Sequence, residues 1–151
     1  MHADFLSHTR QRHWSRELNL ILFLNRDWAP AYGGALELWN ADVTRCEHRI
    51  EPLFNRCIIF RVGRTSFHGV PDRVRCPPGD SRKSAALYYF TDRGAPCPLV
   101  PTHYVPRPVD RPLRRALVRL DGALVHAYSW LKRYTPLNDA RVSGILRRLF
   151  R

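Results

Sequence analysis

The sequence predicts a mainly β domain followed by a basic helical extension, and three observations lead to this fold class. Short apolar runs rich in β-branched and aromatic residues, separated by Gly, Pro and polar turns, fill residues 1–93. Six prolines between Pro96 and Pro112 exclude a continuous helix or a central strand, so residues 94–112 are expected to be an extended connector. Leucines then recur every three or four residues, which predicts helical structure over residues 113–151.

Composition places the chain among reduced globular proteins. With 151 residues and 44% apolar side chains, it can build one core with an appendage. Its four cysteines have neither C-x-x-C spacing nor the density of a disulfide framework, which predicts a cytoplasmic protein with free thiols. No apolar run approaches the length of a membrane span, and the first residues lack the apolar core of a signal peptide.

The charge is concentrated at the C-terminal end. Of the formal net charge of +12, +8 comes from Arg107 onward, where 11 Lys and Arg face 3 Asp. Such an extension could dock on nucleic acid, anionic lipid or an acidic partner. We favour the simpler interpretation, in which these charges form the solvated faces of amphipathic helices.

Four strands are expected in the first domain. Residues 18–25 are apolar at both alternations, as in a strand covered on both faces. Gly33 and Gly34 predict a tight turn before the second strand. The other three strands are expected at residues 35–39, 57–60, which should be buried, and 84–91. Between these strands, residues 7–16, including His8 and His13, and the polar residues 40–49 are expected to be exposed loops.

Two amphipathic helices are expected after the connector. The first has Asp110 as a candidate cap, and Pro136 ends it. Its apolar stripe comprises Leu113, Leu117, Leu120, Leu124, Ala127 and Leu131. The second begins near Asn138 or Asp139, with a stripe of Val142, Ile145, Leu146 and Leu149. We expect the two stripes to pack together and onto the strands; binding of a membrane surface or a partner helix is the alternative.

The candidate functional residues lie at the two ends of the first domain. His2 and Asp4 are two residues apart, so on a strand both side chains leave the same face. A distant histidine, His68, would complete two imidazoles and one carboxylate, the facial triad of non-heme Fe(II) oxygenases. An H-x-D pair alone is common by chance. Followed by His68 and by Arg82-x-Ser84 before a Tyr-rich strand, it is a much stronger signal.

This constellation resembles the 2-oxoglutarate and Fe(II)-dependent dioxygenases, in particular the branch similar to the catalytic domain of prolyl 4-hydroxylase. Residues 18–25, 32–39 and 50–60 are similar to the same branch, and the resemblance covers residues 1–93. It implies a double-stranded β-helix, a relative of the jelly roll built from two facing antiparallel sheets.

The resemblance also implies a role for each residue. His2, Asp4 and His68 would hold Fe(II) and leave three positions for 2-oxoglutarate and O2. Arg82 would pair with the far carboxylate of 2-oxoglutarate and Ser84 would donate a hydroxyl to it, while Lys83 leaves the opposite strand face.

The implied reaction couples decarboxylation of 2-oxoglutarate to succinate with hydroxylation of an unactivated C–H bond. Ascorbate is an implied reductant. The implied substrate is a peptidyl proline or another protein side chain, and a small molecule is also compatible with the sequence.

The position of His2 leads to a further expectation. In the family that the chain resembles, at least one strand and several helices precede the first histidine. We therefore expect the chain to lack its N-terminal part, leaving the strand of His2 and Asp4 with an unpaired edge.

Two other hypotheses are open. An incomplete, inactive barrel could act as a binding module through its basic helices. A metal-binding jelly roll of the cupin kind would add further histidines and give Arg82 and Ser84 no purpose.

Overall fold

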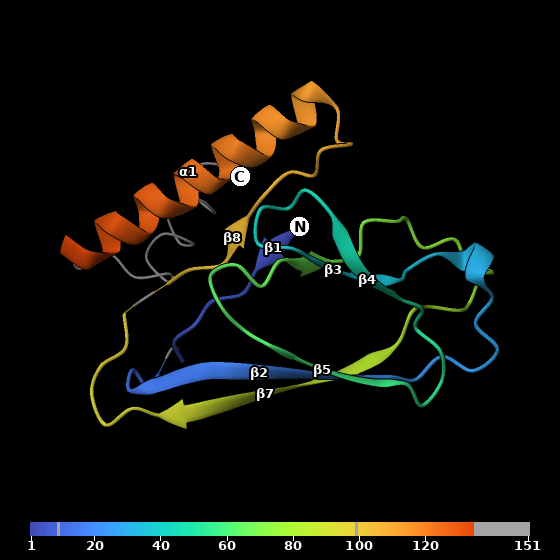
Figure 1. The fold of residues 1–151 in the computed structure, drawn as a ribbon, viewed down its shortest axis with the longest axis horizontal. Helices are drawn as coiled ribbons and strands as arrows, with labels where there is room; N and C mark the ends of the chain where they lie inside the picture. Colours follow the sequence, from blue (N-terminus) through green and yellow to red (C-terminus); the bar gives the residue numbers. More distant parts are fainter. Residues whose placement is uncertain (9, 99, 135–151) are drawn as a thin grey trace, which may run out of the picture.

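The computed structural model describes residues 1–8, 10–98 and 100–134, which form two antiparallel sheets and one C-terminal helix (Figure 1). The predicted mainly β fold class is confirmed, and the paired sheets are compatible with a jelly-roll-like core. The double-stranded β-helix stays a prediction. The predicted second helix falls within residues 135–151, outside the described residues.

The smaller sheet has three strands in the order β5 (Cys57–Arg61), β2 (Trp14–Phe23) and β7 (Ser84–Asp92). The central strand β2 begins four residues earlier than the sequence predicts, so the end of the expected loop 7–16 belongs to the sheet. Its long ladder with β7 runs from Trp14 opposite Asp92 to Phe23 opposite Ser84. This ladder fixes which side chains face the interior.

One face of the three-stranded sheet is largely bare. Leu20 of β2 lies between Ile59 of β5 and Leu87 of β7, so the three share a face. Ile59 is 62% and Leu87 54% exposed. The expectation that residues 18–25 are covered on both faces is therefore wrong for the described part of the chain, and β5 is not buried. An apolar run indicates that a segment forms a strand, but it does not show whether another element covers each face of that strand.

The larger sheet has five strands in the order β4 (Cys46–Ile50), β3 (Leu36–Trp39), β6 (His68–Gly69), β1 (His2–Ala3) and β8 (His103–Tyr104). The sequence missed β4, because its polar, exposed side chains have no apolar alternation. It also missed β8, which lies inside the Pro-rich connector.

Strand β8 corrects one expectation directly. It pairs with β1, placing Tyr104 opposite His2 and His103 opposite Ala3, while β6 pairs on the other side of His2. The Met1 ammonium and the Val105 carbonyl extend this contact at 3.1 Å. The predicted unpaired edge of the His2 strand is therefore wrong, because the connector supplies the missing neighbour.

A small core supports β1 from outside. Ala3 packs with Val43 and Phe67, all buried, and with the partly buried Trp39 and Val105. Ala3 and Phe67 alternate with His2 and His68, so they point to the opposite side of the sheet. The packing fixes the strand whose other face carries the two histidines.

Helix α1 (Pro112–Tyr134) runs across the side of the five-stranded sheet away from β2 (Figure 1). Its predicted apolar stripe is exposed: Leu113 is 73%, Leu117 and Leu120 57% and Leu124 61% exposed. The expectation that this stripe packs on the strands is wrong. Gly122 faces β8, where an added Cβ would make an ordinary van der Waals contact with the Tyr104 carbonyl oxygen at 3.9 Å.

The turn before α1 also differs from the expectation. The buried Asp110 carboxylate accepts the backbone N–H of Arg107 at 2.8 Å and pairs with the Arg107 guanidinium at 3.2 Å. Among the described residues it caps no N–H of the helix. Within the same ranges, none of the helices combines the length and apolar character needed to cross a bilayer.

Candidate metal centre

The structure brings His2, Asp4 and His68 together between the two sheets. Because β1 and β6 are antiparallel with His2 directly opposite His68, the two imidazoles are neighbours, with ring centroids 4.4 Å apart. Asp4 follows two residues after His2. One ligand atom from each of the three side chains lies within 4.8 Å of the others.

Hydrogen bonds orient the two histidines. His68 Nδ1 lies 3.0 Å from the Ser66 carbonyl, so it carries the proton and leaves Nε2 with a free lone pair. That Nε2 is 3.5 Å from Asp4 Oδ2, and His2 Nε2 is 3.5 Å from Asp4 Oδ1. Phe60 packs edge-on against the His68 ring, with centroids 4.8 Å apart. The coordinating nitrogens therefore face the carboxylate from two strands.

Two side chains of β2 hold the Asp4 carboxylate. Asn19 donates its amide N–H to Asp4 Oδ2 at 2.8 Å, and Arg16 Nη2 lies 3.0 Å from the same oxygen. Arg16 also donates to the Asn19 amide oxygen at 2.9 Å, and its guanidinium lies 3.9 Å from the centre of the Tyr88 ring. These bonds occupy Oδ2 and leave Oδ1 as the ligand oxygen.

The charges favour the metal-binding forms of these groups. Burial on its own would raise the pKa of Asp4, but the hydrogen bonds from His2 and Asn19 and the charges of His68 and Arg16 outweigh burial and lower this pKa to about 2. Burial lowers the pKa of His68, against the opposing effects of the Ser66 carbonyl and Asp4. At neutral pH the site therefore offers a carboxylate and a neutral imidazole.

The donor set fits a divalent iron. Two imidazole nitrogens and one carboxylate oxygen are the ligands of a facial triad. At bond lengths of about 2.1 Å, adjacent octahedral ligand atoms lie about 3 Å apart. His2 Nε2 and Asp4 Oδ1, at 3.5 Å, approach this separation, and one ligand atom from each of the three side chains lies within 4.8 Å of the others.

Arg82 lies at the other end of the interior face of β2. Its Nε donates to the Gly34 carbonyl at 2.7 Å, and its guanidinium lies 5.1 Å from the centre of the fully buried Phe23 ring. Burial lowers the pKa of Arg82, which starts high enough to keep the group charged at neutral pH. Its two terminal nitrogens have no protein partner among the described residues, so they are free to bind an anion.

The family is decided by comparison with known proteins. The 2OG-Fe(II) oxygenase superfamily model matches residues 1–90. The chain belongs to the 2OG-Fe(II) oxygenase superfamily. A comparison with curated proteins finds no match. Membership accounts for the Fe(II) and 2-oxoglutarate expected from the sequence, and for O2 as co-substrate.

The two residues after Arg82 take different positions in this oxygenase. Ser84 lies opposite Phe23, so it shares the interior face with Arg82. Lys83 turns outward, where its ammonium pairs with Asp80 at 2.7 Å. The predicted alternation of this segment is thus found. The roles of Arg82 and Ser84 toward 2-oxoglutarate stay predictions.

Sequence reasoning missed Arg16 and Asn19 as supports of the oxygenase centre. Their spacing of three places them on opposite faces of a regular strand. A β-bulge between Arg16 and Leu18 changes the alternation, so that both side chains reach Asp4. The available signal was Asn19 itself, a polar side chain within the apolar run 18–24 that is buried in the structure. By contrast, His8 is the loop histidine that was expected, accepting the N–H groups of Arg10 and Gln11.

Proposed function

We propose that this oxygenase is a 2-oxoglutarate-dependent dioxygenase that hydroxylates an unactivated C–H bond. In this proposal His2, Asp4 and His68 hold Fe(II), and Arg82 and Ser84 bind the co-substrate. The convergence of two imidazoles and an anchored carboxylate on one point is the observation that carries it. Among the described residues, no other group of three potential ligands converges in this way.

The two ends share the interior face of β2, which supports the co-substrate assignment. Asn19, which holds Asp4, and Phe23, which lies under Arg82, are four residues apart on β2, or about 13 Å along the strand. Ile21 is the inward position between them. In this proposal 2-oxoglutarate lies over Ile21, with one carboxylate toward the metal ligands and the other toward the free nitrogens of the long Arg82 side chain.

Each group has a physical task in this reaction. When bound, Fe(II) activates O2 at the expense of 2-oxoglutarate, which loses CO2 and leaves as succinate. Arg16 and Asn19 keep the Asp4 carboxylate oriented, and Ser66 keeps His68 in the tautomer that can bind metal. The Arg82 guanidinium replaces hydration of the far carboxylate with directed donors.

We further propose a peptidyl proline, or another protein side chain, as the substrate, as in the prolyl 4-hydroxylase-like branch. The resemblance of His2, Asp4, His68, Arg82 and Ser84 supports this assignment. The interior is also accessible beside the metal ligands: Tyr88 of β7, which touches Arg16, is 52% exposed. A side chain on an extended peptide could approach along this strand.

The test is succinate release by the full chain with Fe(II) and 2-oxoglutarate, across proline-containing peptides and matched peptides in which alanine replaces proline. We expect succinate only with the proline peptides. With these peptides the product should also be heavier by about 16 mass units, because hydroxylation adds an oxygen atom. Turnover that is equal with both peptide sets would contradict the proline assignment but not the oxygenase. Absence of both succinate and metal binding would favour a binding module.

A further inference from the structure

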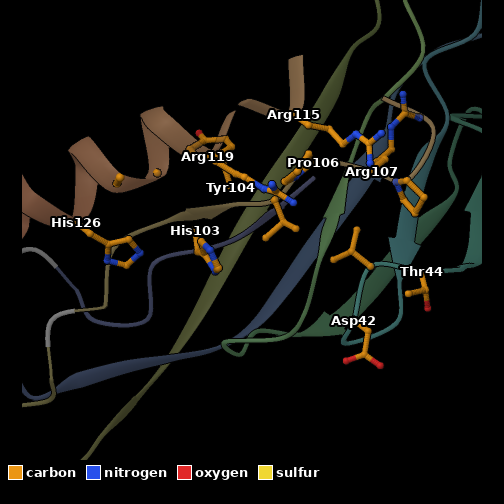
Figure 2. A pocket seen from close by; sticks show the side chains of 14 residues that line it. Asp42, Thr44, His103, Tyr104, Pro106, Arg107, Arg115, Arg119 and His126 are labelled. Atoms are coloured by element: carbon orange, nitrogen blue, oxygen red, sulfur yellow. The ribbon is translucent and has the colours of Figure 1, made fainter. Parts of the chain in front are cut away.

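A basic cavity lies on the far side of the metal-bearing sheet, and most of its lining comes from residues beyond those that match the family. It has a volume of about 660 Å³ and is bounded by α1, β8 and the turn around Val43. Figure 2 shows arginines from the helix and from the segment after β8 directed into one part of it, and two histidines at the other. A cavity of this size is in the range of small-molecule sites, about 300–1,000 Å³.

The charge in the cavity is unbalanced. Arg107, Arg115 and Arg119 line it, while Asp42 is its only carboxylate among the described residues. Arg107 is already held by Asp110. Within the part of the chain that the structure describes, Arg115 and Arg119 form no ion pair. The two arginines lie one helical turn apart, so their side chains are neighbours. Like charges at this spacing repel one another, and a bound anion would relieve the repulsion.

Two imidazoles extend the set of donors. His103 of β8 and His126 of α1 face each other with ring centroids 5.7 Å apart, and both line the cavity. Two guanidiniums with two imidazoles offer more donors than one carboxylate can accept. A phosphate group, with three acceptor oxygens and up to two charges, matches them better.

Apolar side chains form much of the remaining lining, which indicates an organic ligand. They include Val43, Val105, Pro106 and Ala123, beside the hydroxyl groups of Thr44 and Tyr104. Such surface would be left unfilled by an inorganic ion. From the cavity and its unpaired arginines, we propose that this protein binds a phosphate-bearing organic ligand between α1 and β8, with Arg115 and Arg119 as its main phosphate contacts. The phosphate comes either from a small phosphorylated molecule or from a nucleic-acid backbone.

The primary experiment is isothermal titration of the full chain with pyrophosphate at about 0.15 M salt, where weak surface attraction is screened. We expect one site that the double change Arg115→Gln/Arg119→Gln weakens about 10- to 100-fold. Arg111→Gln is the matched control: it removes the same charge just before the helix, outside the cavity, and should leave the affinity within about 2-fold. Arg119→Gln alone alters an exposed side chain, so it tests the site should the double variant fold poorly.

Two further measurements distinguish the two possible sources of the phosphate and test whether 2-oxoglutarate competes for the site. A short single-stranded oligonucleotide that displaces pyrophosphate, and loses affinity in the double variant, identifies nucleic acid as the source. An oligonucleotide indifferent to the double change identifies a small phosphorylated molecule. The proposal is overturned if the wild-type chain does not bind pyrophosphate, if Arg111→Gln weakens it as much as the double change, or if 2-oxoglutarate competes equally well.

Discussion

The two ends of the interior face of β2 differ in how completely the protein holds their charged groups. At the metal end, Asp4 Oδ2 has two donors, Asn19 and Arg16, and Arg16 is itself bound to Asn19. At the other end, the guanidinium of Arg82 makes a single hydrogen bond within the described part of the chain, to the Gly34 carbonyl. The metal ligands are therefore held before any ligand arrives, whereas the Arg82 end is completed by its anion. Changes at the two ends should have different consequences.

The largest effect is expected at the metal end. His68→Ala removes one of three protein ligands, and the remaining pair should hold iron too weakly for turnover. Anaerobic titration with Fe(II), or with Mn(II) as a surrogate, measures the loss directly. His13→Ala is the control, because this histidine is 40% exposed and pairs with Asp92 away from the centre. Unchanged metal binding in His68→Ala would remove His68 from the site.

A change at the Arg82 end should weaken the binding of 2-oxoglutarate and leave metal affinity unchanged. Arg82→Ala leaves a carboxylate unpaired in a partly buried site, so the apparent affinity for 2-oxoglutarate should fall about 10- to 100-fold. Succinate release without primary substrate gives this affinity. Lys83→Ala should change little, since Lys83 pairs with Asp80 at the surface. Equal metal affinity in all three proteins would confirm that the two ends act separately.

The anchored carboxylate predicts a pH-dependent stability of the metal-free chain. The pKa of Asp4 is lowered from 3.8 to about 2, so its charge stabilises the fold above pH 3.8, and this stabilisation is lost as the pH falls toward 2. Asp4→Asn should therefore cost about 2 kcal/mol of unfolding free energy at pH 6, and progressively less below pH 4.

Urea unfolding of both proteins across this pH range measures the difference. The exposed Asp121 on α1 supplies the control, Asp121→Asn, which should change stability little at any pH. A difference between wild type and Asp4→Asn that persists undiminished at pH 2 would contradict the assignment.

The smallest effect on 2-oxoglutarate binding is expected from a change at Gly34, which packs against the Arg82 side chain. A Cβ added at Gly34 would lie 2.9 Å from Arg82 Cδ, and Gly34 has a φ of +76°. Gly34→Ala should displace Arg82 and weaken 2-oxoglutarate by a few fold, besides destabilising the fold by about 1–2 kcal/mol. Gly79 has a similar φ of +88° with nothing within 4 Å of an added Cβ. Gly79→Ala thus reproduces the backbone strain alone, and an equal loss of 2-oxoglutarate affinity in both would exclude the steric explanation.

The sequence predicted the proximity of the candidate ligands better than their surroundings. His2 and Asp4 are two residues apart, as are Arg82 and Ser84, and the two side chains of each pair lie on the same side of the chain although Asp4 and Arg82 are just outside their strands. Their roles stay predictions. The support of Asp4 by Arg16 and Asn19 was not predicted, because a bulge changes the alternation of side chains that sequence patterns assume.

The packing of whole elements was predicted less well. The polar strand β4 and the two-residue strand β8 exist because of their partners, not because of their own composition. For α1, periodicity identified the helix and its apolar stripe, but the stripe is exposed and the helix faces β8 at Gly122. Sequence periodicity gives an element's apolar face, and only tertiary contacts decide whether that face is buried.

The contact between Met1 and Val105 joins residues 104 positions apart, and it lies beside the metal ligand His2. All pairs of the β2–β7 ladder join residues closer in sequence than those of the β1–β8 pairing. Because contacts of higher sequence separation form more slowly, we expect this ladder to precede the β1–β8 pairing in folding. During synthesis, His2 and Asp4 leave the ribosome before His68 and β8, so their strand gains its second neighbour only after residue 104 has followed, and we expect tight iron capture to mark a late stage of folding.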